Sequence, residues 1–311
     1  MRKVLVIAGP TAVGKTKYTC EIGKTLGGEI ISCDSMQLYK GMDIGSAKPS
    51  PEEMALCKHH LVDIVDPKEK FSVAKYQELA LNAIDEVLQS GKLPIIEGGT
   101  GLYLNSILYK MDFADVSEDE ELRESLYKEA EEFGNEYLYN KLVELDEDAA
   151  ARIHPNNVKK LVRAIEGALT GEGIQDISKL NEINTDYDFV LIGLNRDREE
   201  LYDRINERVD ILVEQGLFDE VKNLMDSGLS YDDISMKGIG YKEVISFYNG
   251  QVSKDEAIDN IKKNTRHFAK RQITWFKRYK DMKWFNLSDY DNEQDALSEI
   301  IAYTKEMLKW Q

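Results

Sequence analysis

The sequence predicts an α/β fold in which a parallel sheet is flanked by helices and carries an inserted all-helical subdomain. Short apolar runs typical of strands in a parallel sheet occur at residues 4–8, 28–34, 93–97 and 188–194. Segments with apolar residues at helical spacing separate these runs, and the clearest of them covers residues 72–89. Residues 115–150 hold fourteen Asp or Glu against three Lys or Arg, a shift in composition that indicates an insertion.

The composition is that of a globular chain, long enough for one large or two ordinary domains. The chain has 311 residues, of which 42% are hydrophobic and 31% charged. We expect a catalytic core formed by residues 1–114 and 186–311, and a helical insertion domain formed by residues 115–185. No apolar run approaches the roughly 18 residues of a membrane span, so no membrane partner is expected. The three cysteines form no Cys-x-x-Cys pair, which argues against a zinc site or a disulfide framework and favours a reducing cytoplasm.

The first apolar run leads directly into a phosphate-binding loop. The pattern of glycine, four residues and then Gly-Lys-Thr is complete in Gly9, Pro10, Thr11, Ala12, Val13, Gly14, Lys15 and Thr16. Glycine lets backbone N–H groups turn toward an anion, and the following helix adds a partial positive charge at its N-terminus. Lys15 supplies a point charge for phosphate oxygens, and the Thr16 hydroxyl is placed to ligate Mg²⁺. The predicted core is therefore P-loop NTPase-like, a class for which ATP is the default ligand.

Two further segments are expected at the same edge of the sheet, because ligands bind outside the carboxyl ends of strands in open α/β folds. Asp34 ends the second predicted strand, although capping a loop or helix is the alternative role for this aspartate. Residues 98–101, Gly-Gly-Thr-Gly, follow the third predicted strand. Adjacent glycines allow a ligand or another backbone to come close, and a tight turn without function is the alternative. Thr100 offers a hydroxyl group at this position.

Two sets of basic residues lie in the predicted insertion. Arg123 stands in an acidic run, where pairing with local acids and a contact to a partner both remain open. Lys159, Lys160 and Arg163 lie in the first turns of a predicted helix that Asn157 can cap. Because cations oppose the dipole at a helix N-terminus, this placement indicates an anionic partner.

Arg204 and Arg208 are four residues apart on a predicted amphipathic helix, residues 198–216, and share one of its faces. Guanidinium groups beside a phosphate-binding loop can hold phosphate through paired hydrogen bonds. Pairing with acids of the same helix is the alternative.

The last predicted helix covers residues 253–280 and begins with a Ser-x-x-Glu capping box. Residues 261–280 carry eight Lys or Arg and no acid, although the whole chain has a net charge of −17. Such a basic stripe on an acidic protein is typical of an anion-binding surface. Ile261, Phe268 and Trp275 recur every seven residues and predict the buried face. The basic residues on the other faces include Lys263, Arg266, Lys270 and Arg271.

Seven motifs follow one another over residues 9–280, namely GPTAVGKT, DSMQLYKGMDIGSAKP, HHLVDI, GGTGLY, HPNN with RAIE, GIGYKE and TRHFAKRQITWFKR. In this order they resemble the tRNA dimethylallyltransferase family (isopentenyl-diphosphate:tRNA transferases) of bacterial type. The chain departs from the usual residues by Ser46 in place of Thr, Asn157 in place of Asp and Phe268 in place of Tyr. None of these changes removes a group that the chemistry needs.

The resemblance implies transfer of a dimethylallyl group from dimethylallyl diphosphate to the N6 amine of adenosine at tRNA position 37, with release of diphosphate. The phosphate-binding loop would then hold a prenyl diphosphate rather than ATP. The implied cofactor is Mg²⁺ at Thr16. The implied partners are the tRNA anticodon stem-loop and dimethylallyl diphosphate, and we expect a monomer.

The resemblance also implies roles for individual residues. Asp34 matches the general base. Thr100 matches the residue that supports this base and the target nucleotide. Arg208 and Lys15 match cations that stabilise the leaving diphosphate. The tRNA-binding residues implied by family position are Asp34, Ser35, Met36, Gln37, Thr100, Arg123, Lys159, Lys160 and Arg163. Charge alone adds Lys263, Arg266, Lys270 and Arg271.

Three other functions remain open from the sequence. A small-molecule kinase shares the phosphate-binding loop and the arginine helix, but does not need GGTGLY or the basic helix. A prenyltransferase that acts on free adenine nucleotides uses the same chemistry but gives the basic helix no purpose. A non-enzymatic RNA-binding module leaves Asp34 and the loop unexplained.

Overall fold

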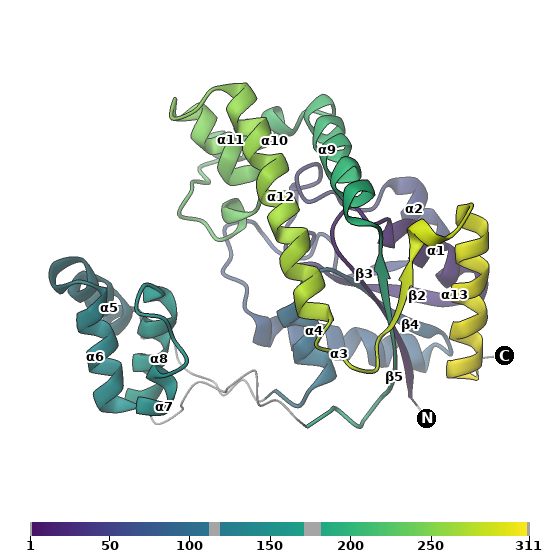
Figure 1. Cartoon of the computed structure of the whole chain (residues 1–311), viewed down its shortest axis with the longest axis horizontal. Coiled ribbons are helices and arrows are strands. Elements are labelled where there is room, and N and C mark those ends of the chain that lie inside the picture. Colours follow the sequence, from purple (N-terminus) through teal and green to yellow (C-terminus); the bar gives the residue numbers. More distant parts are fainter. Residues whose placement is uncertain (1, 112–118, 171–181, 310–311) are drawn as a thin grey trace. The chain divides into compact units, whose positions relative to one another are not determined.

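The computed structural model describes residues 2–111, 119–170 and 182–309 (Figure 1). The chain forms two compact units, a core unit of Met1–Leu108 with Asn184–Gln311 and a helical unit of Tyr109–Ile183. The predicted boundary between residues 114 and 115 lies outside the described residues, so the boundaries of the insertion domain stay a prediction.

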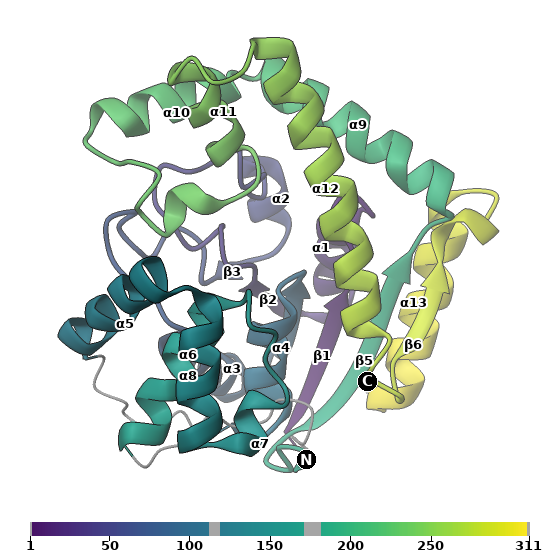
Figure 2. The same ribbon diagram turned by 60° about the vertical axis from the view of Figure 1, so that its left-hand side comes forward.

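A six-stranded sheet with parallel pairings forms the centre of the core unit (Figures 1 and 2). Its strands are β1 (Lys3–Ala8), β2 (Gly28–Cys33), β3 (His59–His60), β4 (Leu93–Gly98), β5 (Asp188–Asn195) and β6 (Lys283–Asn286), in the spatial order β3-β2-β4-β1-β5-β6. The central strand β1 places Leu5 opposite Ile95 of β4 on one side and Val190 of β5 on the other. The predicted fold class is confirmed. Strand β6 escaped prediction because four residues are too few for a periodic pattern.

Helices cover both faces of the sheet, which explains why its strands are continuous apolar runs. Leu5 and Ile7 of β1 pack in one cluster with Ile22 of α1 and Ile300 of α13. Val6 points to the other face and is equally buried, and there α3 packs on β2 and β4 and contacts α4. The helices of the core unit are α1 (Lys15–Leu26), α2 (Pro51–Leu56), α3 (Val73–Gln89), α4 (Gly101–Leu108), α9 (Arg198–Glu214), α10 (Leu217–Asp226), α11 (Tyr241–Tyr248), α12 (Lys254–Phe276) and α13 (Glu293–Leu308).

Side-chain caps start α3 and α12 at the residues where the sequence predicts these helices to begin. The Ser72 hydroxyl accepts the Lys75 backbone N–H at 3.2 Å and caps α3. Ser253 and Glu256 form the predicted capping box at the start of α12. Helix α12 ends at Phe276, four residues before the expected position at Lys280.

The buried face of α12 differs from the heptad prediction. Ile261 is buried, but Phe268 and Trp275 are only half-buried, so the prediction for these two residues is wrong. A seven-residue repeat drifts around a straight helix by about 20° per heptad. The buried positions instead follow three- and four-residue spacing, and one of them is polar. They are Ala257, Ile261, Ala269, Gln272 and Phe276.

The helical unit has its own core. Its helices are α5 (Glu120–Phe133), α6 (Asn135–Leu145), α7 (Glu147–Ala150) and α8 (Val158–Thr170). Leu126, Leu138, Leu142 and Ile165 are fully buried in one cluster that joins three of these helices. Asn157 caps α8 as predicted, because its side-chain oxygen accepts the Lys160 N–H at 3.3 Å. Among the described residues of either unit, no helix is both long and apolar enough to span a bilayer.

Candidate active site at the carboxyl edge of the sheet

The phosphate-binding loop connects β1 to α1 and is held from outside by two arginines. Ala12 and Gly14 have positive φ angles of 63° and 105°, which turn the loop backbone tightly. Arg196 Nε donates to the Val13 carbonyl at 3.1 Å, and Arg204 Nε donates to the Ala12 carbonyl at 3.0 Å. These contacts hold loop carbonyls on the outside of the turn.

A buried carboxylate lies beside the cationic end of this loop. Glu97, at the carboxyl end of β4, is 4% exposed, and burial raises the pKa of its carboxyl group against the opposing effect of Lys15. Burial likewise lowers the pKa of the Lys15 ammonium, while the carboxylates of Glu97 and Asp34 oppose that shift. Lys15 Nζ donates to the Pro10 carbonyl at 3.0 Å, and Thr16 Oγ1 donates to Glu97 Oε1 at 3.5 Å.

Thr100 fixes the backbone that follows Asp34. Its Oγ1 accepts the Ser35 N–H at 3.1 Å, and its own N–H donates to the Cys33 carbonyl at 3.1 Å. The Asp34 side chain is half-buried, and its Oδ1 accepts the Met36 N–H at 2.9 Å. The loops that follow β2 and β4 are therefore joined at the rim where the sequence predicts Asp34 and Thr100.

Arg208, on α9, interacts electrostatically with Lys15, Asp34 and Glu97. Burial lowers the pKa of its guanidinium, and the carboxylates of Glu53, Asp34 and Glu97 oppose this shift. Within the described part of the chain, neither Arg204 nor Arg208 forms an ion pair within 4.0 Å. The structure therefore contradicts the alternative that Arg204 and Arg208 pair with acids of their own helix.

Side chains of the chain itself fill the space beside the two glycines that flank Thr100. A Cβ at Gly99 would lie 2.2 Å from Gln272 Nε2, and one at Gly101 would lie 2.3 Å from the Trp275 ring. Both neighbours come from α12. The sequence suggested a ligand or another backbone as the close neighbour of the adjacent glycines, and this is confirmed at Gly98, where a Cβ would lie 2.2 Å from the Cys33 carbonyl oxygen. The side chains of α12 at Gly99 and Gly101 were not predicted, because spacing alone does not indicate which distant helix packs on a glycine-rich turn.

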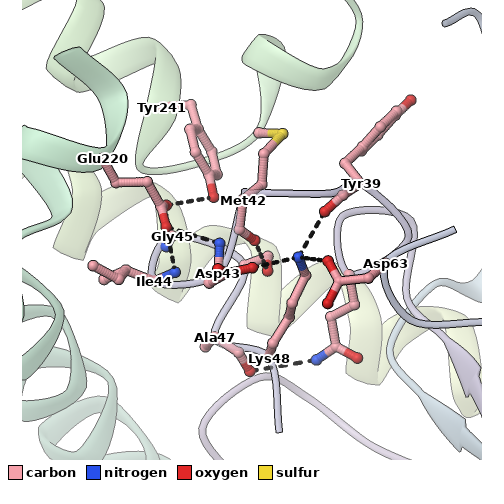
Figure 3. A network of polar contacts seen from close by, with 12 residues as sticks. Tyr39, Met42, Asp43, Ile44, Gly45, Ala47, Lys48, Asp63, Glu220 and Tyr241 are labelled. Atoms are coloured by element: carbon pink, nitrogen blue, oxygen red, sulfur yellow. Dashed lines mark hydrogen bonds and ion pairs between the residues drawn. The ribbon is translucent and has the colours of Figure 1, made fainter. Parts of the chain in front are cut away.

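A polar network anchors the loop that continues from Asp34 (Figure 3). Glu220 Oε2 accepts the N–H groups of Asp43 at 2.8 Å and Ile44 at 2.7 Å. Its Oε1 accepts the Gly45 N–H and the Tyr241 hydroxyl, each at 2.9 Å. One carboxylate of α10 thus binds three consecutive backbone donors, and the tyrosine of the GIGYKE motif holds that carboxylate in place.

Lys48 closes the other end of this loop. Its Nζ donates to the Tyr39 carbonyl and to Asp43 Oδ1, each at 2.6 Å, and it also pairs with Asp63. The Lys48 side chain is 6% exposed, so these contacts replace water around its charge. Sequence reasoning assigned no role to Lys48, Glu220 or Gln272. Lys48 and Gln272 lie within two of the quoted motifs, which was the available signal for them, whereas Glu220 lies in none and had no such signal.

We expect Glu220→Ala to lower the free energy of unfolding by about 1–3 kcal/mol, because three backbone N–H groups and a hydroxyl lose their acceptor. Chemical denaturation of both proteins measures the difference. Asp219→Ala, at the exposed neighbouring position of α10, is the matched control and should stay within about 0.5 kcal/mol of the parent. Equal stabilities of the two variants would contradict an anchoring role.

The predicted tRNA-binding residues of the core unit differ in accessibility. Gln37 is 7% exposed and its Oε1 accepts the Ser32 hydroxyl at 2.9 Å, so it serves the interior of the loop. Arg266 is half-buried and donates to Asn206 Oδ1 at 2.5 Å. Met36 packs against Gly238. Among the described residues, the exposed basic side chains of α12 that form no ion pair include Lys263, Lys270 and Arg271.

In the helical unit, Arg123 joins α5 to α8. Its Nε and Nη2 donate to Glu166 Oε2 at 3.0 and 2.8 Å, and Glu166 is 1% exposed. This partner is distant in the sequence, whereas the sequence suggested a local acid or a bound partner. Lys159, Lys160 and Arg163 lie exposed on α8. Contacts of these four residues with tRNA stay a prediction.

Comparisons with known proteins relate the chain to one family. The model of the family described as IPP transferase matches residues 37–279. A tRNA dimethylallyltransferase from Alkaliphilus oremlandii is 55% identical over 94% of this chain and 93% of the relative. The corresponding protein from Clostridioides difficile is 49% identical over 99% of this chain and 100% of the relative.

Solved structures show the same similarity in three dimensions. A tRNA isopentenylpyrophosphate transferase from Bacillus halodurans matches with a TM-score of 0.76 and 44% identity, over 99% of this chain and 97% of that one. A eukaryotic dimethylallyltransferase described as acting on tRNA matches with a TM-score of 0.82 and 27% identity, over 99% of this chain and 80% of that one. On the family match and the near-complete coverage of these relatives, the chain belongs to the IPP transferase family.

Proposed function

We propose that this protein transfers a dimethylallyl group from dimethylallyl diphosphate to the N6 amine of an adenosine in tRNA, at position 37 beside the anticodon, and releases diphosphate. The observation that carries the proposal is the grouping of Asp34, Lys15 and Arg208 around the phosphate-binding loop. A carboxylate beside a group of cations is what this reaction needs, and the grouping therefore supports the proposal. Relatives named tRNA dimethylallyltransferase, at 55% and 49% identity, support the choice of reaction.

The leaving diphosphate accounts for the cations of the site. An allylic diphosphate ionises readily when the charge that develops on its oxygens is stabilised. Lys15 is held by the Pro10 carbonyl, and Arg204 holds the loop backbone at the Ala12 carbonyl, so these parts of the site can stabilise that charge with little reorganisation. The guanidinium of Arg208 adds a further positive charge near Lys15. The same groups bind the diphosphate product.

The accepting amine accounts for Asp34. The lone pair of an exocyclic adenine amine is delocalised into the ring, which makes the amine a poor nucleophile. A carboxylate that accepts its proton as the C–N bond forms contributes typically ~10²–10⁴-fold. Thr100 acts on this base through the backbone, because its hydroxyl holds the Ser35 N–H immediately after Asp34.

The residues of the site also fit a Mg²⁺ ion. Thr16 Oγ1 and the buried Glu97 carboxylate are hard oxygen donors that lie 3.5 Å apart at the end of the phosphate-binding loop. Thr16 would ligate the ion, and Glu97 would hold its hydration shell or the Thr16 hydroxyl. A bound Mg²⁺ supplies charge neutralisation at the diphosphate.

The basic residues fit a nucleic-acid partner. Exposed cations on α12 (Lys263, Lys270 and Arg271) and on α8 (Lys159, Lys160 and Arg163) would bind phosphates of the anticodon stem-loop. A base stacked in that loop must swing out to reach Asp34. A contact surface much larger than one nucleotide would contribute the free energy for this step. One chain contains every group used in this scheme, so we propose that the monomer is active.

A transfer assay with two acceptors side by side tests the proposal. Labelled dimethylallyl diphosphate is supplied with tRNA that carries adenosine at positions 36 and 37, or with AMP, and tRNA with guanosine at position 37 is the matched control. We expect label only in the adenosine-37 tRNA. Label in AMP but not in tRNA would indicate a free-nucleotide prenyltransferase. Phosphoryl transfer from ATP to a small molecule without any prenyl transfer would indicate a kinase.

A further inference from the structure

Gln272 is a buried polar residue that connects two loops of the site and that the proposed chemistry does not use. It lies on the inner face of α12 and is 5% exposed. Its Oε1 accepts the N–H of Thr11, in the phosphate-binding loop, at 2.9 Å. Its Nε2 donates to the carbonyl of Gly99, in the loop after β4, at 3.0 Å.

The orientation of this amide is fixed by its two partners. A backbone N–H can only donate and a carbonyl can only accept, so the oxygen must face Thr11 and the nitrogen must face Gly99. A Cβ at position 99 would lie 2.2 Å from Gln272 Nε2, so any residue other than glycine would displace this amide from its position. The glutamine of the RQITW segment and the second glycine of GGTGLY are therefore two halves of one contact.

Each loop joined by Gln272 carries one half of the proposed reaction. Thr11 belongs to the segment that would hold the prenyl diphosphate. Gly99 precedes Thr100, whose hydroxyl and N–H hold the backbone on either side of Asp34. A single side chain thus links the donor loop with the support of the base, and a shift of either loop stretches one of its two hydrogen bonds.

We propose that Gln272 is a positioning residue that sets the separation between the diphosphate-binding loop and the Thr100–Asp34 segment, and thereby the distance between the allylic carbon and the accepting amine. The inference rests on the proposed function. It requires no contact between Gln272 and either substrate. A misplacement of reacting groups by about 1 Å can lower a rate by about 10²-fold, so the loss of this link acts on the chemical step.

The test compares Gln272→Met, which keeps the length of the side chain without its amide, with Gln272→Asn, which keeps the amide but is too short to reach both loops. Single-turnover prenyl transfer is measured with donor and tRNA both saturating, together with tRNA affinity and the thermal unfolding midpoint. We expect both variants to lose about 10²-fold in the single-turnover rate constant, with tRNA affinity close to that of the parent. Thr274→Ala, on the exposed side of α12, is the matched control and should keep the parent rate constant.

A second pair of variants separates positioning from general destabilisation. Gly99→Ala displaces Gln272 from the other side, so it should cause the same loss, and the double variant Gly99→Ala with Gln272→Met should lose no more than either single variant. Variants that unfold at a lower temperature but keep the parent rate constant would overturn the inference, as would losses that multiply in the double variant. A parent protein that transfers no prenyl group would instead contradict the proposed function.

Discussion

Replacing Asp34 with alanine should lower the single-turnover rate constant for prenyl transfer by about 10²–10⁴-fold, the usual contribution of a general base. Binding of tRNA should change far less, because Asp34 is one residue among many proposed contacts. The backbone on either side of Asp34 keeps two hydrogen bonds that do not involve its carboxylate, since the hydroxyl and N–H groups of Thr100 bind Ser35 and Cys33. Rapid-quench measurement with saturating donor gives the rate constant, and filter binding gives the tRNA affinity.

Asp34→Asn is the control that isolates the carboxylate. Asp34 Oδ1 also accepts the Met36 N–H at 2.9 Å, and this local turn is lost in the alanine variant. Asparagine keeps an oxygen that can accept the same hydrogen bond but cannot take a proton from the amine. We therefore expect Asn and Ala to be similarly slow. A fast Asp34→Asn enzyme, or a loss of tRNA binding with intact chemistry, would assign Asp34 to loop structure instead.

The parts of the site that could be predicted from the sequence are those encoded by neighbouring residues. The phosphate-binding loop is continuous in sequence, and the strand before it and the helix after it have local signals. The position of Asp34 follows from a general rule, because the carboxyl ends of parallel strands lie at one edge of the sheet. The start of α3 near Ser72 and the capping box of α12 are likewise local, and both were correctly predicted.

The parts that could not be predicted depend on pairs of residues far apart in the chain. Gln272 is 261 positions from Thr11 and 173 from Gly99. Glu220 is separated by a similarly long stretch from the loop that it binds. From the sequence alone, a glutamine in a basic helix is expected to be exposed like its neighbours, and only its partners in the structure show why it is buried. The seven-residue spacing of Ile261, Phe268 and Trp275 was likewise a misleading guide to the buried face of α12, because that face includes Gln272, whose partners lie in two distant loops.

Replacing Arg208 with alanine is expected to lower the rate constant by about 10²–10³-fold, the effect of removing one preorganised group that stabilises charge in a transition state. The guanidinium of Arg208 interacts electrostatically with the carboxylates of Glu53, Asp34 and Glu97, and with Lys15 of the phosphate-binding loop. Its removal leaves these carboxylates repelling the diphosphate. Inhibition by inorganic diphosphate should weaken together with the rate constant, because substrate and product share the site.

Arg208→Lys separates charge from shape. Lysine keeps the positive charge but loses the planar fork that can bind two oxygens at once. If Arg208 forms paired hydrogen bonds to the leaving diphosphate, the lysine variant should recover only part of the lost rate. If it acts as a distant charge, lysine should restore most of it. Unchanged kinetics in Arg208→Ala would exclude both of these roles for Arg208. The loop N–H groups and Lys15 would then be the groups that stabilise the leaving diphosphate, and Arg204 would support the loop through the Ala12 carbonyl.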